Sequence, residues 1–277
     1  MIIQALMENT THCEGLCCEH GLSIWLETNG KRILFDFGSS EGFAQNARQM
    51  GISLQEADLA ILSHGHYDHS GGMLRFLEEN DHAPVYLQQR APEPHYSHRA
   101  SGEIAYIGID PQILQRYADR LRYNSHILTL SDGMLLFSRP EGHEFLSTAN
   151  RNLLIEKPDG EKICDDFAHE QSLLLSEGDK LFLFCGCAHA GIVNIVEQAR
   201  ELTGRWPDYV VGGFHLSNPS SHRMEAPEMI NGVAGRLLET GAVYYTCHCT
   251  GQEVYQIMRE RMGDRVRYLA AGDRVVL

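Results

Sequence analysis

The sequence contains no apolar run that approaches the ~20 residues of a membrane-spanning helix. Residues 1–8 also lack the basic region of a signal peptide, and the stretch after them carries Glu and His side chains instead of an apolar segment. We therefore expect a cytoplasmic protein that does not bind membranes. In that compartment its eight cysteines should be reduced thiols or metal ligands, because cytosolic disulfides are rare.

Positive charge is also scarce. The chain has 23 Lys and Arg against 37 Asp and Glu, which gives a net charge of −14. Such a balance repels phosphate backbones, so we expect a small-molecule substrate and no nucleic-acid partner, and a nuclease is disfavoured. Fifteen histidines are a high number, and histidine is a common metal ligand.

The order of elements predicts an α/β protein. Apolar strand-like segments at Ser23–Leu26 and Arg32–Phe37 flank Asn29-Gly30, which is a strong hairpin signal. Helical and strand patterns alternate over most of the remaining chain, and 277 residues are enough for one large domain, 1–277. The segment around 88–168 is less regular, and we interpret it as an insert. Whether it acts as a lid or only elaborates the surface is left open.

One short segment concentrates potential metal ligands. The run Ser63–Gly72, which reads SHGHYDHSGG, follows the short apolar strand predicted at Asp58–Leu62. His64 and His66 share one side of an extended chain, and Asp68 with His69 can reach a second ion after a bend. Without a bound cation, nothing would compensate the charge repulsion within this cluster or the cost of removing its side chains from water. The alternative interpretation, a polar loop in which histidines cluster by chance, is therefore disfavoured.

Two metals close together can hold and activate one water molecule. Gly65, Gly71 and Gly72 are expected to let the backbone turn tightly around the ions. The His-x-x-x-His spacing of helical zinc proteases is absent from this run.

This run resembles the His-x-His-x-Asp-His signature of the metallo-β-lactamase superfamily. The resemblance implies a four-layer αββα sandwich with the metals at one sheet edge and further ligands at later strand ends. His169 and His248 match the later superfamily histidines. Cys187 falls at the position of the bridging ligand, and His189 lies two residues further on. We favour His189 over Cys187, because imidazole suits the first-row ions that a His/Asp site attracts, whereas thiolate would favour zinc.

Two Cys-x-Cys pairs offer another interpretation. Cys185 with Cys187 and Cys247 with Cys249 are spaced differently from the Cys-x-x-Cys of structural zinc and many iron–sulfur sites. We therefore expect these thiols to line the core or a pocket wall, and a thiolate cluster is the less favoured alternative.

Further segments narrow the resemblance to one branch. These are residues 19–23, 170–173, 186–194, 212–216 and 248–251. Together they are similar to the branch that includes the archaeal dihydropterin ribofuranosylaminobenzene-phosphate synthases, in which an Asp often stands at the position of His169. Under this resemblance, His215 is predicted to act in proton transfer or substrate binding and His20 in substrate binding, with a structural histidine as the alternative for each.

The resulting prediction is a metal-dependent hydrolase or group-transfer enzyme acting on a small anionic substrate that contains a pterin or a phosphate. Two divalent ions, expected to be zinc with iron or manganese as alternatives, would activate the shared water, and Asp68 would also be catalytic. A diiron redox protein and a non-catalytic metabolite sensor on the same fold are the alternatives. The predicted metal ligands are His64, His66, Asp68, His69, His169, His189 and His248.

Overall fold

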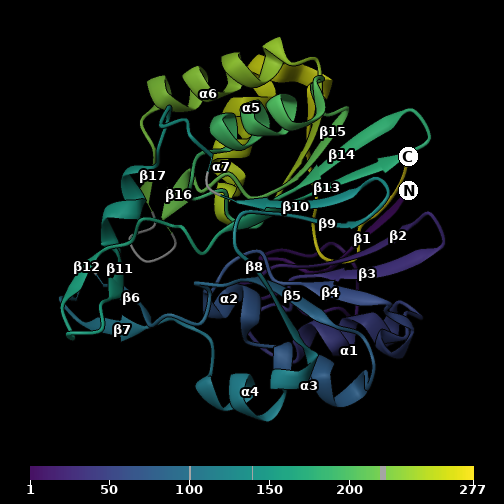
Figure 1. The fold of residues 1–277 in the computed structure, drawn as a ribbon. Coiled ribbons are helices and arrows are strands. Elements are labelled where there is room, and N and C mark those ends of the chain that lie inside the picture. Colours follow the sequence, from purple (N-terminus) through teal and green to yellow (C-terminus); the bar gives the residue numbers. More distant parts are fainter. Residues whose placement is uncertain (100, 139, 219–222) are drawn as a thin grey trace. The chain divides into compact units, whose positions relative to one another are not determined.

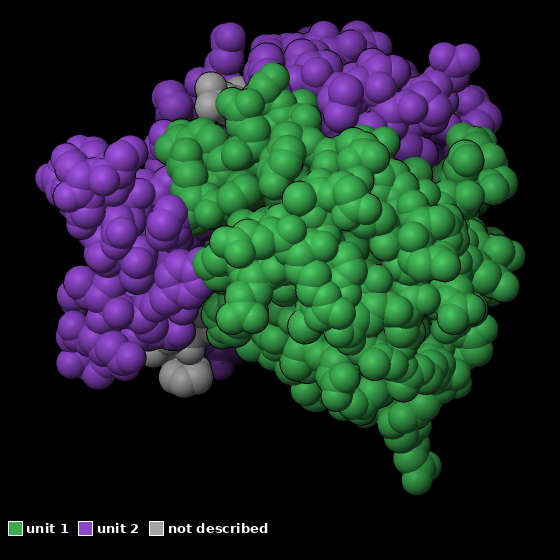
Figure 2. Space-filling view, turned by 60° about the horizontal axis from the view of Figure 1, so that its bottom comes forward, with its two compact units in different colours: residues 1–93, 107–125, 269–277 green, residues 94–106, 126–268 purple. Residues whose placement is uncertain are grey.

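The computed structural model describes residues 1–99, 101–138, 140–218 and 223–277 (Figure 1). They group into two compact units (Figure 2). Unit 1 comprises residues 1–93, 107–125 and 269–277, and unit 2 comprises residues 94–106 and 126–268. Over these described ranges, no helix is long and apolar enough to cross a membrane.

Unit 1 is built on a seven-stranded sheet with the order β20-β1-β2-β3-β4-β5-β8. The predicted hairpin is confirmed: β2 and β3 pair antiparallel, and both turn residues, Asn29 and Gly30, have positive φ, as a two-residue hairpin turn requires. The strands are β1 Ile2–Met7, β2 Ser23–Thr28, β3 Lys31–Phe35, β4 Leu59–Ile61, β5 Val85–Gln88, β8 Leu121–Asn124 and β20 Arg274–Val276.

The helices of unit 1 pack on its sheet through apolar side chains. Phe43 and Phe76 are fully buried and join one core cluster with Leu34 and Phe37 from the strand side. Burial of this kind stabilises the layer by about 25 cal/mol for each Å² of apolar surface. The helical elements are α1 Gly42–Gln49, η1 Leu54–Glu56, α2 Tyr67–Ser70, α3 Met73–Glu79, α4 Pro111–Arg116 and η2 Ala118–Arg120.

Unit 2 has its own seven-stranded sheet, with the order β19-β18-β15-β14-β13-β10-β9. Its neighbours β14, β15, β18 and β19 run parallel, whereas β9, β10, β13 and β14 pair antiparallel. The strands are β9 Ile127–Ser131, β10 Met134–Ser138, β13 Gln171–Glu177, β14 Lys180–Phe184, β15 Tyr209–Gly212, β18 Val243–Thr246 and β19 Val266–Tyr268.

Three long helices pack against this second sheet, in the part of the chain where the sequence predicted alternating helices and strands. They are α5 Ile192–Thr203, α6 Pro227–Glu239 and α7 Gln252–Met262. Ile195, Ile230 and Met258, one from each helix, are buried in a single core cluster together with strand residues such as Val210 and Tyr244. The short elements of unit 2 are η3 Thr148–Asn152, η4 His248–Thr250 and η5 Gly263–Arg265.

The irregular segment 88–168 is divided among three sheets. β8 joins the sheet of unit 1, β9 and β10 join the main sheet of unit 2, and four strands form a separate sheet with the order β12-β11-β6-β7. These four strands are β6 His95–His98, β7 Ile104–Tyr106, β11 Leu153–Glu156 and β12 Lys162–Cys164. Elsewhere in unit 2, β16 Ser217–Asn218 pairs antiparallel with β17 Arg223–Met224.

Candidate metal centre

The predicted metal-binding run lies at the carboxyl edge of the unit 1 sheet. β3 and β4 are parallel neighbours, so the residues that follow them emerge at the same edge. Asp36 comes directly after β3, and Ser63 with His64 comes directly after β4. The main-chain N–H of Asp36 donates to Ile61 O at 2.9 Å, which fixes the two segments side by side.

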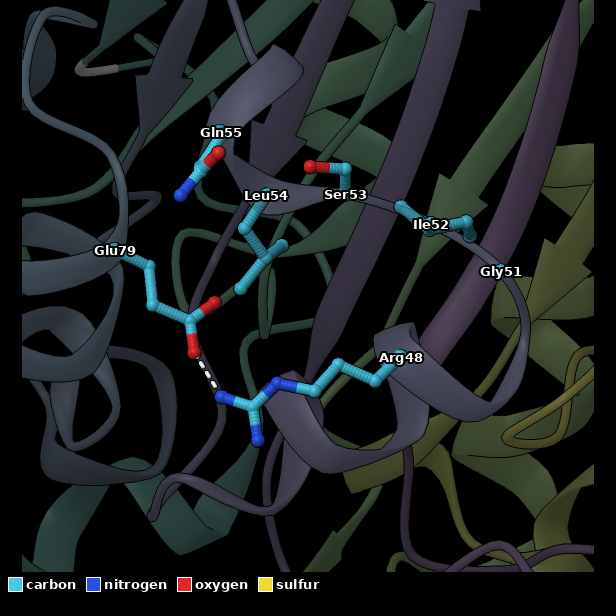
Figure 3. Close-up of a pocket in the computed structure, with 7 residues that line it drawn as sticks. All are labelled: Arg48, Gly51, Ile52, Ser53, Leu54, Gln55 and Glu79. Carbon is cyan, nitrogen blue, oxygen red and sulfur yellow. Dashed lines mark hydrogen bonds and ion pairs between the residues drawn. The ribbon is translucent and has the colours of Figure 1, made fainter.

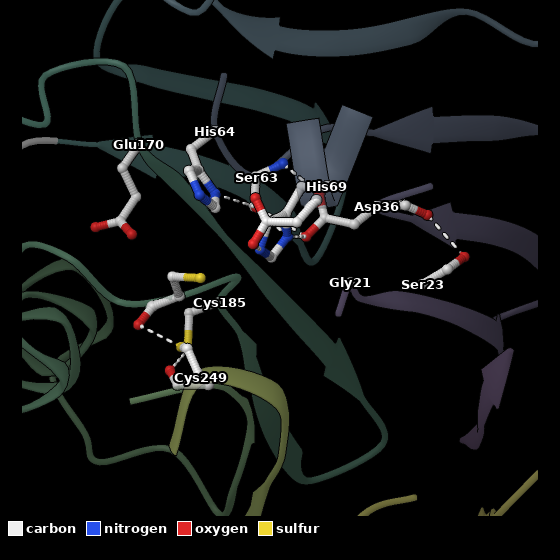
Figure 4. A network of polar contacts seen from close by, with 12 residues as sticks. Gly21, Ser23, Asp36, Ser63, His64, His69, Glu170, Cys185 and Cys249 are labelled. Carbon is white, nitrogen blue, oxygen red and sulfur yellow. Dashed lines mark hydrogen bonds and ion pairs between the residues drawn. The ribbon is translucent and has the colours of Figure 1, made fainter. Parts of the chain in front are cut away.

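Asp36 organises this edge (Figure 4). Its Oδ1 accepts from Ser63 N at 2.7 Å, and its Oδ2 lies 2.7 Å from both Ser63 Oγ and His69 Nδ1. Ser63 Oγ also lies 2.9 Å from His64 Nδ1. A carboxylate or hydroxyl on Nδ1 orients a histidine so that Nε2 is the nitrogen that binds a metal. Sequence reasoning missed Asp36, although its place at a strand end was a usable signal.

The four ligands predicted from the first motif lie together within unit 1. The ring of His64 has its centroid 4.6 Å from that of His66 and 4.2 Å from that of His69. Asp68 Oδ2 lies 3.9 Å from His69 Nε2 and 3.1 Å from Nε2 of His20. All four motif residues are buried, and imidazole with carboxylate is a donor set that fits a first-row divalent ion.

Two glycines of the motif have a different role from the one predicted. Gly71 and Gly72 have negative φ, so they are not needed for a left-handed turn. Instead, a Cβ on Gly71 would lie 2.1 Å from Ser39 O, and one on Gly72 would lie 2.2 Å from Phe37 O. The missing side chains therefore let this segment pack directly against the backbone that follows β3.

Replacing Asp36 with asparagine should weaken metal binding about 10–100-fold, as the loss of an orienting partner typically does. The amide has a single oxygen in place of the two that now serve Ser63 and His69. Metal affinity measured by competition with a chelator tests this. Asp58→Asn is the control, because Asp58 accepts Arg32 N at the opposite end of the same strands. Equal affinities in the two variants would contradict the assignment.

In unit 2, His169 belongs to a buried triad. Nε2 of His169 and Nδ1 of His95 lie 3.1 Å and 3.0 Å from the same oxygen, Asp165 Oδ2, and all three side chains are fully buried. Burial raises the pKa of Asp165, but the two imidazoles outweigh it and hold that pKa well below its ordinary value. Burial lowers the pKa of His169, which favours the neutral ring that a metal requires.

Several contacts hold His189 in place. Its main-chain N–H donates to Glu170 Oε1 at 2.8 Å, its ring stacks on Phe167 with centroids 4.6 Å apart, and its Nδ1 lies 3.2 Å from Asn150 Oδ1. Glu170 Oε2 accepts from Ala190 N at 2.9 Å. Burial raises the pKa of Glu170 to about 7, although these two main-chain donors oppose the shift.

A Glu170→Gln variant should change the pH dependence of stability. The pKa of Glu170 is about 7 in the folded protein, against an ordinary value of 4.5. The contribution of Glu170 to the stability of the fold is therefore fully present below pH 4.5 and is lost as the pH rises toward 7. The free energy of unfolding of the variant, measured relative to that of the wild type, should therefore rise by about 3 kcal/mol between pH 4.5 and pH 7. Urea unfolding of chelator-treated protein at several pH values measures this, with Glu177→Gln, at the far end of the strand that Glu170 precedes, as control. Parallel pH profiles would refute the shift.

The remaining predicted residues of unit 2 follow parallel strands. β14, β15 and β18 are adjacent and parallel, and they lead into Cys187, His215 and His248 respectively. All three residues are buried. His215 lies with its ring centroid 4.2 Å from that of His189. The structure therefore brings the unit 2 candidates to one sheet edge. Cys249, which the sequence predicted to line the core or a pocket wall, lies beside them.

The surface pocket in Figure 3 is not part of this centre. It has a volume of about 490 Å³ and is lined by residues 51–55 together with Arg48 and Glu79, which form an ion pair across it. Residues 51–55 precede β4, whereas the metal-binding run follows it. The pocket lining contains no histidine or cysteine, and its carboxylate, Glu79, is paired with Arg48.

Comparisons with known proteins agree with this geometry. Residues 18–143 match the model of the metallo-β-lactamase superfamily. The crystal structure of Tm1679, a metal-dependent hydrolase of the β-lactamase superfamily, is 27% identical and covers 100% of this chain and 99% of its own, with a TM-score of 0.82.

The chain is similar to proteins of the metallo-β-lactamase superfamily. The predicted fold class is confirmed, because a mixed α/β chain with two large sheets matches solved structures of this superfamily over its whole length. Zn²⁺-bound PqqB from Methylobacterium extorquens, at 14% identity and a TM-score of 0.58 over 100% of both chains, shares the fold alone.

Two curated proteins to which the chain is similar come from Methanocaldococcus jannaschii. One, a 7,8-dihydropterin-6-methyl-4-(β-D-ribofuranosyl)-aminobenzene-5′-phosphate synthase, is 26% identical over 92% of this chain and 88% of its own. The other is an uncharacterized protein, 28% identical over 90% of this chain and 91% of its own. The predicted resemblance to the synthase branch is thereby confirmed.

Proposed function

We propose that this protein is a metal-dependent hydrolase or group-transfer enzyme with two divalent ions, zinc or else iron or manganese. The observation that carries the proposal is the buried set of His64, His66, Asp68 and His69, with Asp36 and Ser63 orienting two of its rings. Under the superfamily signature, the further ligands are His169, His189 and His248. When bound, the ions supply Lewis acidity and lower the pKa of a shared water.

The protein's own residues would position the reactants. Asp68 carries a carboxylate next to His20, at 3.1 Å, and we assign it the orientation of the attacking water. His20 is one-third exposed, which suits the substrate contact we assign to it. His215 is the second group that we place against the substrate.

For the substrate we propose a small anionic molecule that carries a phosphate or a pterin. The support is the synthase relative, whose name includes both groups, at 26% identity over 92% of this chain. A nucleic acid fits poorly, because a net charge of −14 repels a phosphate backbone.

Metal removal tests the proposal. Chelation of the purified protein should abolish cleavage of an activated phosphodiester such as bis(p-nitrophenyl) phosphate, and re-addition of zinc, manganese or iron should restore it, because the ions activate the water. Elemental analysis of the untreated protein should show about two equivalents of metal. A protein that is metal-free and takes up none would overturn the proposal, and tight binding of a metabolite without turnover would favour the sensor alternative.

A further inference from the structure

His20 connects an N-terminal loop to the metal-binding run, and all the residues involved belong to unit 1. Its Nε2 lies 3.1 Å from Asp68 Oδ2, and its Nδ1 lies 3.3 Å from the side-chain nitrogen of Asn9. Both ring nitrogens therefore have a partner, one on each side. The half-buried Asn9 thus begins a chain of three side chains that ends on a carboxylate of the candidate metal centre.

A further contact fixes which way the amide of Asn9 points. The main-chain N–H of Gly21 donates to Asn9 Oδ1 at 3.4 Å, so the NH2 group of the amide is the part that faces His20. An amide NH2 group donates and does not accept, so Nδ1 of His20 is the acceptor. A neutral imidazole that accepts at Nδ1 carries its hydrogen on Nε2, and that hydrogen faces the carboxylate of Asp68.

Main-chain contacts hold these three side chains within reach of one another. Glu19 N donates to Glu8 O at 3.1 Å, which joins the segments directly before the asparagine and the histidine of the chain. Leu22 N donates to Asp68 O at 3.1 Å, and a Cβ on Gly21 would lie 2.9 Å from that same oxygen. The backbone therefore passes so close to the metal-binding run that only a glycine fits there.

We propose that Asn9 and His20 are positioning residues that hold the carboxylate of Asp68 in one orientation. Carboxylates that bind a metal are themselves hydrogen-bonded, and that outer bond fixes how the group is turned. The N–H at Nε2 of His20 supplies this bond, and Asn9 acts through His20 by restraining the ring and keeping its hydrogen on Nε2. The inference rests on the proposed function, in which Asp68 binds metal and orients the attacking water.

The assignment also restricts how His20 contacts a substrate. A neutral imidazole has one N–H and one accepting nitrogen, and in this arrangement both are used within the protein. The side chain is 32% exposed, so its ring still contributes surface to the site. In this arrangement His20 therefore contacts the substrate through the ring and does not donate a hydrogen bond to it.

The affinity of the full-length protein for Zn²⁺, measured in competition with a chelator, tests the contact between His20 and Asp68. His20→Ala should weaken binding about 10–100-fold, as the loss of an orienting partner typically does. His20→Gln should recover part of the affinity, because its amide NH2 can donate to the carboxylate as Nε2 does now. His20→Leu is the matched control: it fills similar space but cannot donate, so it should recover none.

The role of Asn9 is tested by a double-mutant cycle. Asn9→Ala should weaken Zn²⁺ binding about 3–10-fold, the usual effect of one hydrogen bond. In the His20→Ala background it should have no effect, because Asn9 acts through the ring. Thr11→Ala is the control in the same loop: its hydroxyl donates to Ala271 O at 2.8 Å, so affinity should stay unchanged in both backgrounds.

Nuclear magnetic resonance of metal-free protein labelled with ¹⁵N-histidine reads the tautomer directly. At mildly alkaline pH, the ring of His20 should carry its hydrogen on Nε2, because Asn9 donates to Nδ1. The signals of this ring are those that disappear in His20→Gln. The measurement needs neither metal nor substrate, so it is independent of any turnover.

Three results would overturn the inference: hydrogen on Nδ1 of His20, equal recovery by glutamine and leucine at that position, or an equal effect of Asn9→Ala in both backgrounds. A wild type that turns over, with variants that bind Zn²⁺ as tightly as it does, would refute this inference and leave the proposed function intact. An inactive wild type with the expected tautomer and affinities would support the positioning of Asp68 although the proposed function fails. If His20→Ala does not fold, His20→Leu takes its place in the cycle.

Discussion

Replacing His66 with alanine should remove metal from the protein and reduce turnover more than the ~10–100-fold expected for the loss of an orienting partner. His66 is only 4% exposed and has extended backbone angles directly before α2, so its imidazole is fixed beside that of His64. Alanine leaves a cavity that cannot donate an electron pair to an ion. Elemental analysis and phosphodiester cleavage measure the two effects.

The matched control for this variant is His82→Ala. His82 belongs to the same unit, but its side chain is 59% exposed and pairs with the neighbouring Asp81. It should therefore keep wild-type metal content and turnover. His248→Ala, which removes a predicted ligand of unit 2, should resemble His66→Ala. If His66→Ala and His248→Ala both turn over normally with their folds intact, the proposed mechanism is wrong.

Replacing Asp165 with alanine should destabilise the protein by about 2–5 kcal/mol, because two charge-assisted hydrogen bonds are lost and two buried imidazoles are left unsatisfied. His95 and His169 both bond to Asp165 Oδ2, and all three side chains are fully buried. Asp165 Oδ1 also accepts Phe167 N at 2.7 Å, so the turn before β13 loses its cap as well. Urea unfolding measures the change.

Asp166→Ala is the control for Asp165. Its carboxylate accepts Ala168 N at 3.1 Å, and its side chain lies at the surface. Such an exposed contact should cost less than about 1 kcal/mol. Two variants of equal stability would show that the buried triad does not contribute to folding. A destabilised Asp165→Ala that also binds metal less tightly would support the role of His169 as a ligand.

The sequence alone determined the strongest local signals. The Asn29-Gly30 turn, the apolar period of α5 and the cluster at 64–69 depend on neighbours within a few residues, so pattern and spacing were enough to predict them. The superfamily signature then implied the fold class, because the ligands recur at fixed places along the chain. Short strands such as β6, which spans His95–His98 and reads HYSH, show no alternation of apolar and polar residues. The sequence therefore did not predict them.

Only the tertiary structure identified the partners of the site residues. Asp36 lies 33 residues before His69, and His95 lies 70 residues before Asp165, so no local pattern connects them. Their pairing depends on which strands are neighbours, and that is set by the packing of whole sheets. The same holds for Cys187, His215 and Cys249, which come together because three parallel strands end at one edge. Spacing predicts which side chains can bind a metal, but strand order decides which of them meet.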